Sequence, residues 1–112
     1  MRKTFDAELM DLGNELTEMA ATAQDAIDLV TSSLSKGEDR GAKAAITLTA
    51  SMDQMEKDIE NHCMSLLMRQ QPVARDLRTI SAALKMVTDL QRIGDQAMNI
   101  AQWAIFCVTG EL

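Results

Sequence analysis

Three polar side chains recur at every fourth residue in the last third of the sequence. Gln91, Asp95 and Asn99 would share one face of a helix. Gly94 lies beside them and has no side chain, so a backbone, a ligand or an ion could approach the helix closely there. A helix that carries a glycine and polar groups in line with its apolar residues is costly to maintain. This pattern favours a functional site over a spacer.

Carboxylates form a second set in the middle of the sequence. Asp53, Glu56 and Glu60 are three and four residues apart and so also share one helical face. If the two faces meet between antiparallel helices, their oxygen ligands converge on one strip. Hard cations prefer such clusters of carboxylate and amide oxygens. The alternative is a solvated acidic face that pairs with basic neighbours, for which the candidates are Lys57, Arg69 and Arg92.

The remaining reactive side chains give little support to catalysis. His62 is the only histidine, and the Glu-x-x-His ligand pair of di-iron proteins would need an acid at the position of Ile59. Cys63 and Cys107 have apolar neighbours and no CxxC spacing, which predicts two buried, reduced thiols. A long thin bundle rarely encloses a pocket with a nucleophile and a base. We therefore expect a protein that is not an enzyme.

The composition favours a single all-α domain over residues 1–112. The chain has 46% hydrophobic but only 3% aromatic residues and a single proline, whereas all-β domains usually need aromatics and turn residues. A net charge of −6 and the lack of a basic patch argue against nucleic acid as a partner. No apolar run is long enough to cross a bilayer and the N-terminus has no apolar signal region. We expect a cytoplasmic protein.

Apolar periodicity predicts three long helices. They are expected to span residues 5–36, 39–68 and 73–108, with Gly37 after the first and Pro72 before the third. Short loops place consecutive helices antiparallel, which gives an elongated up-down-up three-helix bundle. The residues expected to face its core are Phe5, Leu9, Leu12, Leu16, Met19, Ala23, Ala26, Val30, Leu34, Ala45, Leu48, Met52, Met55, Ile59, Cys63, Leu66, Val73, Leu77, Ile80, Leu84, Val87, Ile93, Ala97, Ile100 and Ala104.

The connection between the second and third helices is richer in polar residues than a turn requires. Residues 70–78 read QQPVARDLR, with two glutamines, two arginines and an aspartate around the proline. One interpretation is structural, in which Asp76 favours the helix dipole while Arg75 and Arg78 pair with acids of the second helix. The other is a polar end of the bundle that contacts a partner, through Gln71, Arg75, Asp76, Arg78 and Arg92.

These motifs together resemble those of the PhoU family of phosphate-uptake regulators. The matching segments are QPVARDLR at residues 71–78, DLQRIGD at residues 89–95 and NIA at residues 99–101. Weaker support comes from FDAEL at residues 5–9 and from residues 53–60 with Cys63. The resemblance implies a three-helix repeat that usually occurs twice per chain. Residues 1–112 would then be one repeat, which either forms a homodimer or is the N-terminal half of a longer protein.

The resemblance also implies a function. A protein of this kind is a cytoplasmic negative regulator of the phosphate-starvation response. It links the ATPase of the phosphate ABC transporter to a sensor histidine kinase. Such a protein acts by docking and reaches the membrane only through its partners.

A metal site is implied as well, because some members bind metal clusters through E(D)xxxD motifs. The corresponding residues are Glu56, Glu60, Gln91 and Asp95, with Asp53 and Asn99 as weaker ligands. Iron, zinc, magnesium and manganese are the candidate cations. Position 91 is commonly glutamate in the family, and the neutral Gln91 adds no charge to the site. A purely structural helical interaction module without metal is the alternative.

Overall fold

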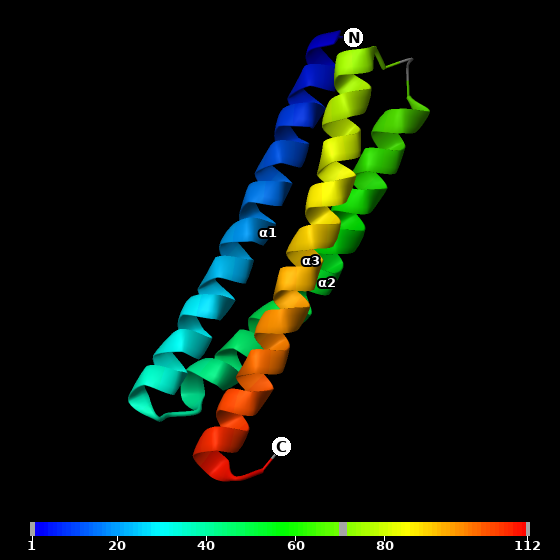
Figure 1. Cartoon of the computed structure of the whole chain (residues 1–112). Coiled ribbons are helices and arrows are strands. Elements are labelled where there is room, and N and C mark those ends of the chain that lie inside the picture. The colour runs from blue at the N-terminus through cyan, green and yellow to red at the C-terminus, as the bar shows by residue number, and fades with distance from the viewer. Residues whose placement is uncertain (1, 70–71, 112) are drawn as a thin grey trace.

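Three helices make up nearly the whole computed structural model, which describes residues 2–69 and 72–111 (Figure 1). They are α1 (Arg2–Lys36), α2 (Arg40–Met68) and α3 (Ala74–Thr109). Each runs antiparallel to the next, and together they form a rod of 56 × 18 × 17 Å. The predicted all-α bundle is confirmed, with helix ends within three residues of those expected. Among the described residues, no helix has the length and apolar character needed to cross a membrane.

Glycines end two of the helices. Gly37 follows α1 with φ of 68°, and its N–H donates to the carbonyl oxygen of Ser33 at 2.9 Å. Gly110 follows α3 with φ of 78°, and its N–H donates to the carbonyl oxygen of Phe106 at 2.8 Å. Glycine reaches this left-handed conformation without strain because it has no Cβ. The turn predicted at Gly37 is therefore the observed one.

The start of α2 is capped by a side chain of α1. Asp39 precedes the helix, but its side chain makes no capping hydrogen bond. Instead, the N–H of Ala42 donates to the buried Oγ of Ser33 at 2.7 Å. Gly41 lies against the same part of α1, where an added Cβ would be only 2.6 Å from the carbonyl oxygen of Leu29. The first turn of α2 is thus held directly against α1.

The core has two parts that differ in side-chain size. The half of the rod that holds the N-terminus of α1 contains mostly large side chains, which are Phe5, Leu12, Met19, Ala23, Met52, Ile59, Cys63, Leu66, Ile80, Ala83 and Val87. The other half contains almost only small ones, which are Ala26, Val30, Ala42, Ala45, Ala97, Ala101 and Ala104. Because the distance between packed helices depends on the side chains at their contact, small residues let the helices approach more closely.

Some apolar residues that periodicity assigns to the core are exposed, and these assignments were wrong. They are Leu34, Val73, Leu77, Ile93 and Ile100. Ser33 and Asp76, each adjacent in sequence to one of them, are buried instead. The apolar stripe read from the sequence is wider than the surface that two neighbouring helices can cover in a three-helix bundle.

Candidate functional site

The faces of α2 and α3 that carry the predicted metal ligands meet. Nε2 of Gln91 on α3 donates hydrogen bonds to Oδ1 of Asp53 on α2 at 2.8 Å and to Oδ1 of Asp95 at 3.1 Å. The two aspartates are exposed and Gln91 is half-buried. One amide group therefore joins carboxylates from two helices. We call this surface the acidic strip, and its residues are Asp53, Glu56, Glu60, Gln91 and Asp95.

Glu56 is a carboxylate of the strip whose pKa is raised above its ordinary value. Partial burial raises its pKa, and the negative charges of Glu60, Asp53 and Asp95 raise it further, while Lys57 lowers it. The charges of neighbouring turns of α2 and of α3 therefore act on one carboxyl group. Negative potential is concentrated on this part of the surface.

The strip does not contain a preformed metal cluster. Among the described residues, no group of three or more histidine, cysteine, aspartate or glutamate side chains is close enough to hold an ion. The amide nitrogen of Gln91 lies between the two aspartates, and its Oε1 atom is buried without a hydrogen-bond partner in the described part of the chain. Asn99, on the exposed surface one turn beyond Asp95, extends the same helical face.

The space left by Gly94 is occupied by a side chain rather than open to a ligand. An added Cβ would lie 2.8 Å from Sδ of Met52 and 3.0 Å from its Cε. Gly94 is buried and Met52 is fully buried. The glycine was expected to admit a backbone, a ligand or an ion, but a methionine side chain lies there instead, and the close approach serves helix packing beneath the strip.

His62 and the two cysteines lie outside the strip. Nδ1 of His62 is paired with a carboxylate oxygen of Glu15, which joins α2 to α1. Cys63 is buried, and burial raises the pKa of its thiol, with smaller contributions from the charges of Glu15 and Glu60. Cys107 is exposed, so the prediction of two buried thiols was half wrong. The reason is that the buried face of α3 ends at Ala104.

The start of α3 is anchored to the start of α1 through a buried carboxylate. Oδ2 and Oδ1 of Asp76 accept hydrogen bonds from Nη1 and Nη2 of Arg2 at 2.5 and 2.7 Å. The N–H of Val73 also donates to Oδ2 of Asp76 at 3.2 Å. The hydrogen bonds from Arg2 lower the pKa of Asp76, although burial opposes them. Asp76 is only 1% exposed and faces Arg2 rather than a partner.

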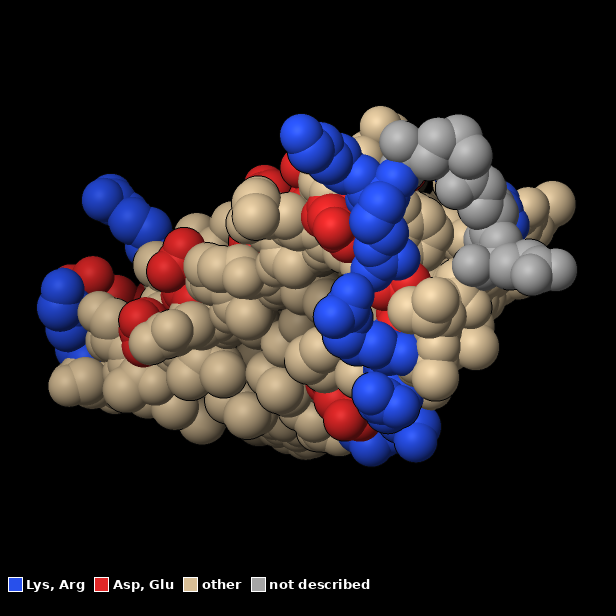
Figure 2. Space-filling model, turned by 90° about the horizontal axis from the view of Figure 1, so that it is seen from above, with Lys and Arg blue, Asp and Glu red and all other residues tan. Residues whose placement is uncertain are grey.

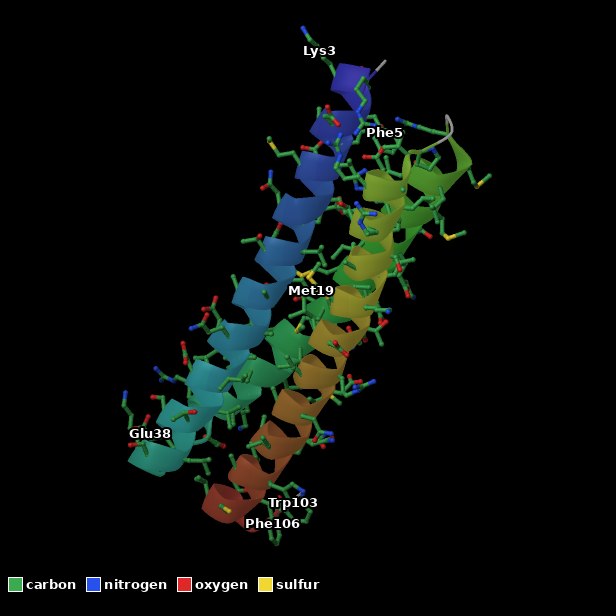
Figure 3. All side chains as sticks on the ribbon, turned by 45° about the horizontal axis from the view of Figure 1, so that its top comes forward. Lys3, Phe5, Met19, Glu38, Trp103 and Phe106 are labelled. Atoms are coloured by element: carbon green, nitrogen blue, oxygen red, sulfur yellow. The ribbon has the colours of Figure 1, made fainter. Side chains whose placement is uncertain are left out.

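Basic side chains gather around this anchor at the end of the rod. Figure 2 looks down on that end and shows Lys and Arg side chains in a band across it. Five exposed residues of three helix termini contribute, and we call them the basic end: Arg2, Lys3, Arg69, Arg75 and Arg78. Lys3 extends away from the bundle (Figure 3), and Arg69 is paired with Glu8. The antiparallel topology brings these termini together, so the expectation that the chain lacks a basic patch was wrong.

Of the residues predicted to contact a partner, two lie on the basic end in exposed positions. They are Arg75 and Arg78. Arg92 is about 21 Å further along α3 at the helical rise, where it pairs with Asp89 at 3.6 Å. Gln71 lies outside the described residues. Arg2, Lys3 and Arg69 were missed, although the predicted topology puts their helix termini beside residues 75–78.

An elongated bundle of three amphipathic helices, with an acidic strip between two of them and a basic end, belongs to the class of all-helical bundle proteins. The comparisons with known proteins give the family. The PhoU domain matches residues 16–104, and the chain belongs to the PhoU domain family.

Three of the relatives are each named phosphate-specific transport system accessory protein PhoU homolog. The chain is 40% identical over 111 residues to that of Clostridium acetobutylicum, covering 98% of this chain and 50% of the relative. It is 40% identical over 98 residues to that of Aquifex aeolicus, covering 88% and 44%. The homologue of Pseudomonas aeruginosa is 35% identical over 108 residues, covering 96% and 45%. The chain thus spans about half the length of these relatives. No solved structure matches it.

Proposed function

We propose that this chain is a non-enzymatic regulator of phosphate transport and phosphate-starvation signalling that acts by docking to other proteins. The observation that carries the proposal is the 40% identity, over 98% of the chain, to a phosphate-specific transport system accessory protein. Its partners are the ATPase of a phosphate ABC transporter and a sensor histidine kinase. Its place is the cytoplasm, where it reaches the membrane through these partners.

The basic end is the surface that we propose for docking. It concentrates positive charge on a protein whose net charge is −6, so it selects an acidic surface on the partner and steers its approach. Arg75 and Arg78 are exposed on the first turns of α3, and the bidentate ion pair between Arg2 and Asp76 fixes the helix that carries them. In this proposal Asp76 positions the surface and does not touch the partner.

The test is a charge reversal on the basic end. The double variant Arg75→Glu, Arg78→Glu should weaken binding to the purified transporter ATPase by about tenfold or more, mainly through slower association. The matched control is Lys36→Glu with Arg40→Glu, which makes the same change of charge at the opposite end of the rod. Equal loss in both variants, or binding that neither changes, would contradict docking through the basic end.

We further propose that the acidic strip takes a metal cation, either iron, zinc, magnesium or manganese. Two observations support it. Burial and, after it, the neighbouring carboxylates raise the pKa of Glu56, and Oε1 of Gln91 is buried without a partner among the described residues. A cation would relieve both, and the residues that would hold it are Glu56, Glu60, Gln91 and Asp95, with Asp53 and Asn99 further out. For this, the amide of Gln91 must turn its oxygen toward the aspartates.

A helical interaction module without metal is the competing proposal, and one contact favours it. Nε2 of Gln91 already donates to Asp53 and Asp95, so the amide occupies the position between these carboxylates. A bound ion raises the thermal midpoint by mass action, whereas a merely solvated face gives no response that depends on the cation. Unfolding followed by circular dichroism with each cation in turn separates the two proposals.

Two variants sharpen this measurement. Gln91→Glu restores a charged ligand and should increase the shift of the thermal midpoint by a metal. Asp95→Ala should abolish the shift while leaving helicity nearly unchanged, because Asp95 is exposed. The same metal content in the wild type and Asp95→Ala after dialysis would refute the assignment of the ligands.

A further inference from the structure

Two hollows lie on the surface between α1 and α2. The smaller has a volume of about 130 Å³ and is lined by Glu15, Glu18, Met55, Asp58 and Ile59. The larger has a volume of about 400 Å³ and is lined by Asp25, Asp28, Leu29, Ser32 and Leu48. Both are lined by residues of α1 and α2, so they lie on a different side of the bundle from the acidic strip between α2 and α3. We call the two hollows together the α1–α2 groove.

Helical spacing places the two hollows in line along the bundle. On α1, Glu18 and Asp25 are seven residues apart, and on α2 the same interval separates Leu48 from Met55. Seven residues are nearly two helical turns, so each pair stays on one flank of its helix. Ten residues separate Glu15 from Asp25, which is about 15 Å at the helical rise. The groove therefore runs parallel to the helices.

The floor of the groove is apolar. Leu29 and Leu48 pack against the alanine core, and Met55 packs against the core of large side chains. All three are only half-buried, so part of each side chain remains at the surface. Ser32, also half-buried, adds a small side chain to the larger hollow. An apolar side chain of a partner could therefore be buried in either hollow.

The rim of the groove is acidic, and most of its charge is not neutralised. Nδ1 of His62 is paired with Glu15. Within the described part of the chain, no lysine or arginine forms an ion pair with the other four carboxylates, which are Glu18, Asp25, Asp28 and Asp58. One reason lies in the sequence, since residues 4–35 of α1 include seven Asp and Glu but no Lys or Arg. The rim thus keeps negative charge for a partner.

This combination of floor and rim decides which partner fits. Negative charge attracts a cationic partner and repels nucleic acid. A small cation could neutralise the rim, but it would leave the apolar floor uncovered. A groove between two helices accepts the ridge of side chains of a third helix, and apolar residues at i, i+3, i+7 and i+10 of such a helix would reach both hollows. We propose that the α1–α2 groove binds an amphipathic helix of a partner protein that carries lysine or arginine on both edges of its apolar face.

Binding in this groove is independent of docking through the basic end. The groove lies along the side of the rod, between α1 and α2, whereas the basic end is formed by helix termini. The two surfaces have opposite charge and so select opposite partners. One chain can therefore hold an acidic surface at its end and a basic helix at its side.

The test uses a defined peptide as the probe. It is a fluorescein-labelled helix of leucine and lysine, about 18 residues long, with the leucines on one face. Fluorescence anisotropy should show that it binds the chain and that binding weakens as salt is added. A peptide of the same composition in scrambled order forms no apolar face and should bind at least about tenfold more weakly. The double variant Asp25→Asn, Asp28→Asn should weaken binding of the amphipathic peptide by about tenfold or more.

Two further variants separate the groove from a general attraction between opposite charges. Asp89→Asn with Glu111→Gln also removes two exposed carboxylates, on α3 and just after it, and should leave the dissociation constant within about twofold of the wild type. Ser32→Phe fills the larger hollow without a change of charge and should weaken binding by about tenfold. Circular dichroism checks that each variant keeps its helicity.

Four results would overturn the proposal. Equal losses in the two double variants would mean that the peptide responds only to net charge. Unchanged binding by Ser32→Phe would mean that the larger hollow is not occupied, and equal binding of the two peptides would exclude recognition of a helix. Binding of spermidine that is lost in Asp25→Asn, Asp28→Asn, without binding of the peptide, would make the groove a site for small cations. None of these results bears on the basic end, which is tested through Arg75 and Arg78.

Discussion

The two halves of the rod reach the same helical packing by opposite means. Near the N-terminus of α1, large side chains such as Leu12, Met19 and Ile59 interlock across the axis. In the other half the core is almost entirely alanine, and the helices meet through backbone and small groups, as where Gly41 lies against Leu29. The stability of the first half should fall when a core side chain is made smaller, and that of the second half when one is made larger.

The outer surfaces of the two halves also differ. The half with large core residues ends in the arginines of the basic end, whereas α3 in the alanine half has exposed apolar residues such as Ile100 and Trp103. Exposed apolar residues occur in the first half too, as at Met68 and Leu77, but there they lie near the charges of the basic end. The fold thus provides a charged contact surface at one end and an apolar one toward the other.

The largest effect should come from the core of large side chains. Ile59→Ala removes a side chain that is 1% exposed and should cost about 2–5 kcal/mol of the free energy of unfolding, through lost burial and a cavity. Urea unfolding followed by circular dichroism measures it. Met64→Ala is the control on the surface of α2 and should change stability by less than about 0.5 kcal/mol. Similar costs for the two variants would mean that this half is not packed as described.

The half of the rod with the alanine core should instead be destabilised by one added methyl group. Gly41→Ala places a Cβ 2.6 Å from the carbonyl oxygen of Leu29 and 2.7 Å from Oγ of Ser33, neither of which can move freely. We expect a loss of about 1–3 kcal/mol from the separation of α1 and α2. Gly13→Ala is the control, since nothing lies within 4 Å of its added Cβ, and it should gain up to about 1 kcal/mol in α1. A gain in both variants would disprove the close contact.

The cap that α1 supplies to α2 should contribute less. Ser33→Ala leaves the N–H of Ala42 without its partner in a buried position and should cost about 1 kcal/mol. Hydrogen exchange of the first turn of α2 should quicken together with the fall in the urea midpoint. Ser35 is exposed at the end of α1, so Ser35→Ala serves as the control. If the two serines behave alike, the hydroxyl of Ser33 is not the cap.

The anchor at the basic end should give a dependence on pH. The pKa of Asp76 is lowered in the folded protein, so its stabilisation is present above the ordinary carboxyl pKa and is lost as the pH falls through the lowered value. Asp76→Asn removes that stabilisation. The difference in urea midpoint between wild type and variant should therefore be largest near neutral pH and shrink in acid. A difference that stays constant with pH would show that the charge of Asp76 is not what stabilises the fold.

Local periodicity in the sequence predicts the helices and the acidic strip well. Residues spaced by three and four share a face whatever the tertiary structure, and short loops place neighbouring helices antiparallel. The faces that carry Asp53 and Gln91 could therefore meet, and a hydrogen bond joins these two residues. The same reasoning fails where a contact joins distant parts of the chain. Arg2 and Asp76 are 74 residues apart, and nothing in the local pattern pairs them.

The sequence also does not reveal how much of an apolar stripe one bundle covers. Ile93 and Ile100 fit the periodicity of the core but lie outside it, because three helices bury only part of each stripe. Cys107 is exposed for a related reason, since α3 continues beyond the last buried residue, Ala104. Leu34 is a further miss in the half of the rod with the small core, whereas Val73 and Leu77 lie at the start of α3 in the half with the large core.

The smallest effect should come from the glycine between the two halves. Gly94→Ala brings a Cβ to 2.8 Å from Sδ of Met52, but this atom belongs to the flexible end of a side chain that can change rotamer. The gain in helix propensity of up to about 1 kcal/mol opposes the cost of repacking, so we expect almost no net change in the urea midpoint. Gly41→Ala, whose Cβ meets a backbone oxygen, is the direct comparison. A loss as large as that of Gly41→Ala would mean that Met52 is held as rigidly as a backbone, and that the packing beneath the acidic strip tolerates no adjustment.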